Sequence, residues 1–232
     1  AWDKLPNPFS ETLFPGERYG KGKLATTIIG SRGCPMTPPC SFCANVHRTP
    51  VIFRSVNNII GELKELADRG VTHVRFEDDC FTIHPQFERL CHELKQLKIK
   101  FKGHTRSDLL TPKRAELMRE AGCEECGLGV ESADNKVLLI NHKKETAEDH
   151  SKAIKILRSV GIRAKPYFMA GLPGETDKTL ELNKEFMKTC KPEKWTLSTF
   201  TPYPGSAVYK SPGLFGVQII NNDWSKWGNF CK

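Results

Sequence analysis

The feature that most constrains this chain is a regular alternation of short apolar segments with amphipathic helical segments. Six segments have the length and side chains of strands: residues 24–29, 72–77, 99–104, 124–130, 163–170 and 195–200. Between them, apolar positions recur at helical spacing. Strands that alternate with helices in this way are typical of parallel βαβ units. The 232 residues therefore predict one α/β domain with a substantial core.

Capping residues locate the helices between these strands. The predicted helices cover residues 55–70, 85–97, 111–122, 146–160 and 176–190. Ser55 and Thr111 are typical N-caps, and Thr111 is followed by a proline that suits the first helical position. Pro85 is expected in the first turn of the second helix.

Two architectures fit this order of elements: an open doubly wound sheet and a partial (β/α)6 TIM-like barrel of parallel strands. Polar residues follow nearly every strand directly, at 77–79, 104–106, 131–132, 171–175 and 201–205. In a barrel, the carboxyl ends of all strands meet at one mouth, so one site can use all of these residues. In an open sheet, residues from six strands would not meet. We therefore predict the partial barrel.

The charge of the chain bears on its partners and its location. The net charge is +8 and the pI is about 9.0. The basic residues are scattered and include Lys143, Lys144, Lys152, Lys155 and Arg158, which read as solvated helix faces. This argues against a nucleic-acid partner without excluding one, and an anionic substrate is the main alternative. No apolar run is long enough to span a membrane and no signal peptide opens the chain, so we expect no membrane association and a cytoplasmic location.

Three cysteines directly follow the first strand and suggest a metal centre. Cys34, Cys40 and Cys43 lie within ten residues of one another. Thiolates are soft ligands that suit an iron–sulfur cluster or zinc. With His47 as a fourth ligand, the same loop would be a structural zinc site.

The other six of the nine cysteines indicate no second metal site. Cys123 and Cys126 form a CxxC at the start of the fourth predicted strand, and we expect them to be core residues. The remaining four stand alone: Cys80, Cys91, Cys190 and Cys231. Of these, Cys80 adjoins an acidic segment that follows a strand.

The cysteine loop resembles that of the radical S-adenosylmethionine (SAM) superfamily, which has three cysteines after the first strand and an aromatic residue before the last. Phe42 occupies that aromatic position. The resemblance implies that the cysteines hold a [4Fe–4S] cluster, and that SAM bound at its open iron is cleaved to a 5′-deoxyadenosyl radical. One departure is that five residues, rather than the usual three, separate Cys34 from Cys40. This gap leaves the subfamily in doubt.

The resemblance extends to motifs at the ends of later strands and covers nearly all of residues 24–209. It implies that cofactor-binding residues follow four strands: Glu77, Asp78, Asp79, Arg106, Glu131, Ser132, Phe168, Met169 and Gly171. The acidic run at 77–79 would receive the amino group of SAM. Arg106 would meet a carboxylate of SAM or of the substrate, or else form a structural ion pair with Asp108. Residues 131–132 would contact the ribose, and residues 168–171 the adenine.

Taken together, the motifs are most similar to the cobalamin-binding branch of the superfamily. This implies methyl transfer as the leading reaction, with cyclisation, rearrangement or methylthiolation as alternatives; a non-catalytic zinc module is the alternative of another class. The expected partners are a reductant such as ferredoxin or flavodoxin, a cobalamin-binding domain outside this chain, and a small-molecule or peptide substrate. We expect a linker or arm over residues 1–23, the core over 24–209 and a C-terminal extension over 210–232.

Overall fold

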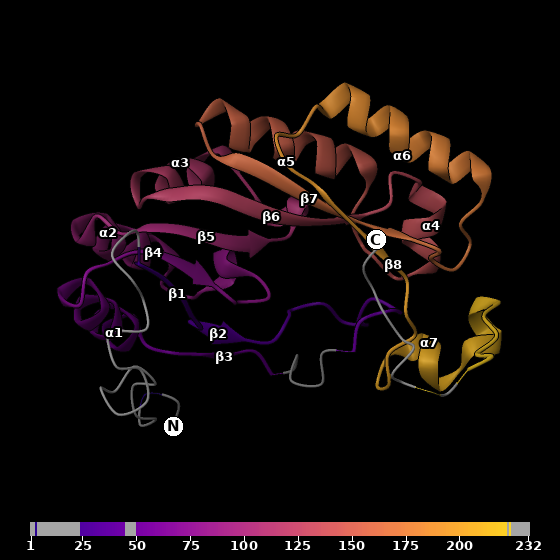
Figure 1. Ribbon diagram of the computed structural model, residues 1–232, viewed down its shortest axis with the longest axis horizontal. Coiled ribbons are helices and arrows are strands. Elements are labelled where there is room, and N and C mark those ends of the chain that lie inside the picture. The colour runs from indigo at the N-terminus through magenta and orange to yellow at the C-terminus, as the bar shows by residue number, and fades with distance from the viewer. Residues whose placement is uncertain (1–2, 4–23, 45–49, 222, 224–232) are drawn as a thin grey trace.

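The computed structural model describes residues 3, 24–44, 50–221 and 223. Its main sheet has six strands: β1 (Leu24–Ile28), β4 (Val71–Phe76), β5 (Lys100–Thr105), β6 (Cys123–Glu131), β7 (Arg163–Ala170) and β8 (Thr196–Thr199). All neighbouring strands are parallel, and their order in the sheet is their order in the sequence. In a doubly wound sheet, the order in which successive strands are added would reverse at a switch point. The sheet instead curls one way into an open half-barrel, which confirms the predicted partial barrel (Figure 1).

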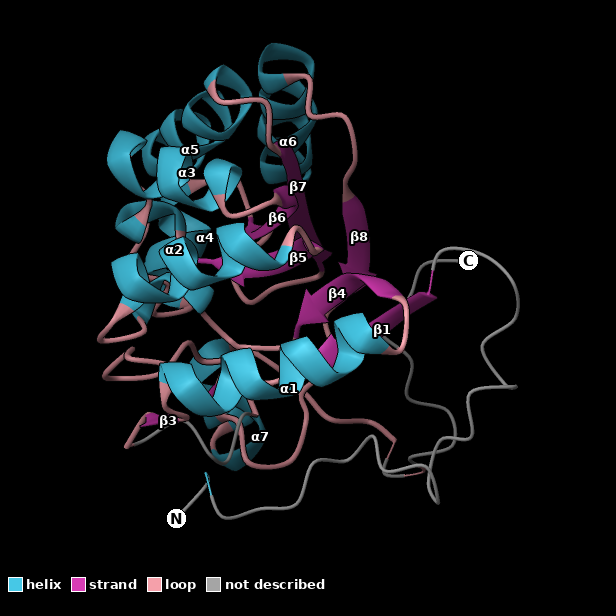
Figure 2. Cartoon of the chain, turned by 90° about the vertical axis from the view of Figure 1, so that its left-hand side faces the viewer, coloured by secondary structure: helices cyan, strands magenta, loops and turns pink. Residues whose placement is uncertain are grey.

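Five longer helices cover the outer face of this half-barrel: α1 (Val56–Asp68), α2 (Phe87–Leu97), α3 (Pro112–Glu120), α5 (Ala147–Ser159) and α6 (Asp177–Cys190). Figure 2 shows them around the outside of the curled sheet, whose edge strands β1 and β8 lie toward its open side. The predicted caps Ser55 and Thr111 are confirmed, and Thr146 is a third N-cap that was not predicted. The side chains of Ser55, Thr111 and Thr146 each accept a backbone N–H from the first turn of α1, α3 and α5, respectively.

The second helix begins later than the sequence indicates. The expectation that Pro85 lies in its first turn is wrong, because a 3-10 turn at Phe81–Ile83 intervenes and Gln86 is the N-cap. Several short elements were also not predicted: the antiparallel pair of β2 (Ser31–Arg32) with β3 (Ile52–Phe53), η4 (Ser107–Leu109), α4 (Asn135–Ile140), α7 (Ala207–Lys210) and η5 (Pro212–Phe215). Such short elements depend on tertiary contacts more than on local preference.

The hydrophobic core lies between the sheet and these helices. Phe76, Phe81 and Phe101 pack against one another there, with ring centroids 4.8 to 5.4 Å apart. Cys123 and Cys126 are fully buried in this core, as predicted. The opposite, inner face of the sheet carries mainly polar side chains. In the described part of the chain, no helix is long and apolar enough to cross a membrane.

Candidate active site at the carboxyl ends of the strands

The start of the cysteine loop is held by two acidic residues at the end of β4. The carboxylate of Asp78 accepts the backbone N–H of Gly30 at 2.7 Å and the hydroxyl of Ser31 at 2.6 Å. The carboxylate of Asp79 accepts the N–H of Gly33 at 3.0 Å. Burial raises the pKa of Asp78, although these hydrogen bonds favour its charged form. Asp78 is 4% exposed and fixes the loop, and its contact with SAM stays a prediction.

The other end of the loop is held by Ser41, which lies between Cys40 and Cys43. Its N–H and its hydroxyl donate to the backbone oxygen and the side-chain oxygen of Asn141, at 2.9 and 2.7 Å. The carbonyl of Ser41 accepts the N–H of Val208 in α7 at 3.1 Å. The contact of Ser41 with Asn141 was not predicted, because no local pattern relates residues that are 100 positions apart.

The three thiols fit a multi-iron cluster by their chemistry. Cys34, Cys40 and Cys43 are all half-buried on this one loop. Burial raises the pKa of Cys34, and raises that of Cys40 to about 11. The nearby charge of Arg106 favours both thiolates, and Lys143 favours that of Cys40. Soft thiolates beside fixed cations suit an iron–sulfur cluster.

The zinc alternative is only partly tested by the structure. Among the described residues, no three His, Cys, Asp or Glu side chains come together closely enough to hold a metal ion. An iron–sulfur cluster is wider than one ion, so its thiol ligands do not converge on a single point. His47, the fourth ligand of the zinc alternative, lies outside the described residues.

A buried network of charges lies beneath the loop. Arg106 binds both carboxylate oxygens of Asp108, at 2.9 and 2.8 Å, and a carboxylate oxygen of Glu145 at 3.1 Å. The structure thus shows the predicted ion pair of Arg106 with Asp108, and the contact of Arg106 with a carboxylate of SAM stays a prediction. The second oxygen of Glu145 accepts the N–H of Ser107 at 2.7 Å.

Lys143 belongs to this network, and the prediction that it lies on a solvated helix face is wrong. It follows α4 and is 8% exposed, with its ammonium 2.8 Å from Glu145. Burial opposes its charge, but Glu145 and Glu131 outweigh that effect and raise its pKa. Its neighbour Lys144 is exposed and donates to the carbonyl of Thr37 in the cysteine loop at 2.7 Å. The sequence offers no signal that separates these two lysines.

Glu131 ends β6 in an unusual backbone conformation. Its φ is +64°, and the N–H of Ser132 donates to the carbonyl of Val130 at 2.7 Å, which closes a strained γ-turn. Burial raises the pKa of Glu131. A Cβ at Gly129 would lie 2.8 Å from the carboxylate of Glu131 and 3.2 Å from the ammonium of Lys143, so glycine leaves room for both groups. Ser132 is fully buried and accepts the N–H of Asp134, and its contact with the ribose stays a prediction.

The remaining predicted residues stay predictions. Glu77 is exposed and pairs with Arg75 at 3.1 Å. Phe168 packs edge-on against Phe186 of α6, on the outer face of the sheet. Phe42 and Met169 are half-buried, and Gly171, at a φ of +84°, donates its N–H to Glu175. The backbone contacts predicted for residues 168–171 remain compatible with these positions.

Together, the fold and the loop define a class: a parallel half-barrel whose first strand leads into a three-cysteine site at the carboxyl ends of the strands. The sequence profile described as the radical SAM superfamily matches residues 28–187. The chain belongs to the radical SAM superfamily.

Individual relatives show how much of a whole protein this chain represents. It is 28% identical over 232 residues to an uncharacterised methyltransferase of Pyrococcus horikoshii, covering 97% of this chain and 50% of that protein. It is 30% identical over 190 residues to the anaerobic magnesium-protoporphyrin IX monomethyl ester cyclase of Rubrivivax gelatinosus, covering 79% and 34%. The chain thus spans half or less of the length of these relatives.

A solved structure shares the fold. The radical SAM methyltransferase TsrM of Kitasatospora setae, with cobalamin and a [4Fe–4S] cluster bound, superposes with a TM-score of 0.71. The match has 19% identity and covers 79% of this chain and 38% of that chain.

Proposed function

We propose that this chain is the catalytic core of a radical SAM enzyme that holds a [4Fe–4S] cluster on Cys34, Cys40 and Cys43, and that methyl transfer is its leading reaction. One observation carries the proposal: a loop of three half-buried thiols, fixed at both ends, opens at the carboxyl ends of a parallel half-barrel. When bound, the cluster would supply the electron that cleaves the sulfonium of SAM.

The residues of this chain would position and shield that chemistry. Asp78 and Asn141 fix the two ends of the loop and so set where the thiols lie. The buried ammonium of Lys143 would offset the negative charge that three thiolates bring to a partly desolvated site. Asp79 and Glu131 are the candidates for the amino group and the ribose of SAM. The electron would come from a partner such as ferredoxin or flavodoxin.

Methyl transfer rests on the names of relatives and on the resemblance to the cobalamin-binding branch. It would require a cobalamin-binding domain outside these 232 residues, with residues 1–23 as the linker, 24–209 as the core and 210–232 as an extension. The match to a cyclase keeps cyclisation or rearrangement as the second candidate reaction. The substrate would be a small molecule or a peptide.

Anaerobic reconstitution tests the cluster. We expect about four irons and four sulfides per chain, and a reduced-cluster signal that changes when SAM is added. Replacing any one of Cys34, Cys40 and Cys43 by serine should abolish this signal, whereas Cys190→Ser, away from the loop, should leave it unchanged. Stoichiometric zinc without a response to SAM would contradict the proposal.

The products made from SAM separate the candidate reactions. The reconstituted full-length protein, with a reductant and added cobalamin, should form both 5′-deoxyadenosine and S-adenosylhomocysteine if it transfers a methyl group from SAM. Formation of 5′-deoxyadenosine alone would favour cyclisation or rearrangement over methyl transfer.

A further inference from the structure

The inner face of the half-barrel is built in polar layers that the cluster site does not use. The strand register places Lys102 opposite Glu125 and Glu125 opposite Arg163, nearest the amino ends of the strands. The next layer places His104 opposite Gly127 and Gly127 opposite Lys165. The inside of a closed barrel is usually filled by bulky aliphatic side chains. This face is instead polar, and most of its side chains are half-exposed.

A hydrogen-bonded pair of rings crosses β6 on this face. The Nε2 atom of His104 lies 3.2 Å from the hydroxyl of Tyr167, which projects from β7. Gly127 lies between them. A Cβ there would collide with the His104 ring and lie 2.7 Å from Cε2 of Tyr167. The glycine therefore permits this pair, because any larger residue would push the two rings apart.

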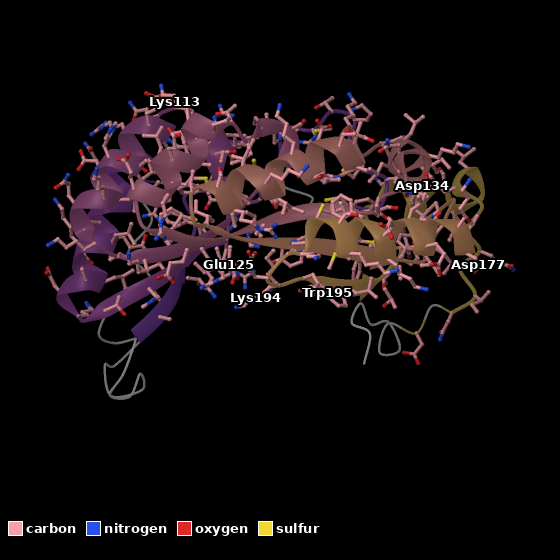
Figure 3. The ribbon with its side chains drawn as sticks, turned by 90° about the horizontal axis from the view of Figure 1, so that it is seen from above. Lys113, Glu125, Asp134, Asp177, Lys194 and Trp195 are labelled. Atoms are coloured by element: carbon pink, nitrogen blue, oxygen red, sulfur yellow. The ribbon has the colours of Figure 1, made fainter. Side chains whose placement is uncertain are left out.

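Positive charge is in excess around the pair. The ammonium of Lys165 lies 5.1 Å from the centre of the Tyr167 ring. Within the described part of the chain, no carboxylate approaches it to ion-pair distance. Glu125 is shared among three cations: Lys194 at 3.1 Å (labelled beside it in Figure 3), and Lys102 and Arg163 at 3.6 Å each.

The charge balance of this face can be counted. The four cations Lys102, Arg163, Lys165 and Lys194 face two carboxylates, because Arg163 also approaches Glu124 at 4.0 Å. Arg75 and Glu77 balance each other. Burial lowers the pKa of His104, which keeps its ring neutral at neutral pH. Asp79 is a third carboxylate whose charge reaches His104, so among the described residues one positive charge remains in excess on this partly open face.

We infer that Lys165, Tyr167 and His104 form a binding site for an anionic group, a carboxylate or a phosphate, of the substrate. Lys165 supplies the counter-charge, and the hydroxyl of Tyr167 donates to the anion when Nε2–H of His104 donates to its oxygen. The assignment of this anion to the substrate rests on the proposed function, because it places the substrate inside the same half-barrel. The anion site itself is defined by these residues alone.

Chemical protection of Lys165 tests the site without knowledge of the substrate. Acylation of each lysine by a small ester is followed by mass spectrometry, with inorganic phosphate, glutarate or neutral glycerol as the probe. We expect either anion to slow acylation of Lys165, and glycerol to have no effect. Lys152, which is exposed on α5, is an internal control that no probe should protect. Protection by only one anion would support the site and identify the charged group.

Two variants link the protection to the ring pair. Tyr167→Phe removes one hydrogen bond to the anion and should weaken its apparent affinity about tenfold. Gly127→Ala should weaken it as well, because the new methyl group displaces both rings. Lack of protection of Lys165 by either anion in the unmodified protein, or equal protection of Lys152, would overturn the inference. Both cluster-free and reconstituted protein are used, so a failure to bind the cluster is seen separately from a failure to bind the anion.

Discussion

At the scale of single residues, Glu145 holds the candidate site together. Its carboxylate contacts the ammonium of Lys143, the guanidinium of Arg106 and the N–H of Ser107, and its side chain is fully buried. Two buried cations depend on it, and a buried charge that loses its partner is far less stable than one in water. Neither its place in the sequence nor any motif marks Glu145 as important.

Replacing Glu145 by Gln should therefore be strongly destabilising. We expect the free energy of unfolding, measured in urea, to fall by about 3–5 kcal/mol because Arg106 and Lys143 lose a shared buried carboxylate. Glu181→Gln is the matched control, since Glu181 forms only an exposed ion pair with Lys184 on α6 and should change little. Equal effects of the two substitutions would show that the network does not stabilise the fold.

His150 should make the stability of the protein depend on pH. It is fully buried and its Nδ1 lies 2.8 Å from the hydroxyl of Ser107. Burial is the main cause that lowers its pKa from 6.5 to about 3. Between these values the unfolded chain binds a proton that the folded protein does not, so stability is lost as the pH falls below 6.5.

Between pH 6 and pH 4, we expect the free energy of unfolding of the unmodified protein to fall with decreasing pH. The fall should be steeper than that of His150→Leu by about 1.4 kcal/mol per pH unit. Urea unfolding at several pH values measures both slopes, and the comparison removes contributions from other groups. Parallel slopes would mean that His150 takes up a proton in the folded state.

At the scale of elements, two short helices that the sequence did not predict fix the cysteine loop. Asn141, at the end of α4, accepts from Ser41 and donates to the carbonyls of Val137 and Pro173 at 2.9 Å each. It thus joins the loop to α4 and to the turn after β7. The N–H of Val208 in α7 adds a third attachment.

Asn141→Ala should loosen the loop that carries the thiols. We expect the free energy of unfolding, measured in urea, to fall by about 2–4 kcal/mol, because several buried polar groups lose their partners. The iron content after reconstitution should also fall. Asn57→Ala, on the exposed side of α1, is the control that should retain its iron. Full iron content in Asn141→Ala would show that the loop does not need this attachment.

At the scale of the whole molecule, the two faces of the sheet have opposite roles. The outer face and the helices that cover it (Figure 2) bury the apolar core, and the inner face carries charged and polar side chains. Because side chains alternate along a strand, adjacent residues of β5 belong to different environments. Phe101 is 1% exposed in the core, whereas Lys102 is half-exposed on the inner face.

This arrangement predicts a sharp contrast between neighbouring substitutions. Phe101→Ala should lower the free energy of unfolding by about 3–5 kcal/mol, because it leaves a cavity among aromatic rings. Lys102→Ala should cost much less, since its 3.6 Å contact with Glu125 is solvent-exposed on the lysine side. Similar losses would contradict the assignment of the two faces.

The sequence determined the features that depend on near neighbours. Helical periodicity and capping residues located the long helices, and Ser55 and Thr111 cap two of them as expected. The βαβ alternation predicted parallel strands, and the polar residues that follow the strands predicted the barrel and the place of the cysteine loop. These features are local because propensity, capping and periodicity act over a few residues.

Only the tertiary structure decided which polar residues are buried and what they contact. It buries Lys143 and exposes Lys144, assigns Asp78 to the loop, engages Arg106 with Glu145, and pairs His104 with Tyr167 across Gly127. Each of these outcomes depends on contacts between residues far apart in the sequence. The free energy of a buried charge is set by the partners that the fold places around it, and no local pattern records those partners.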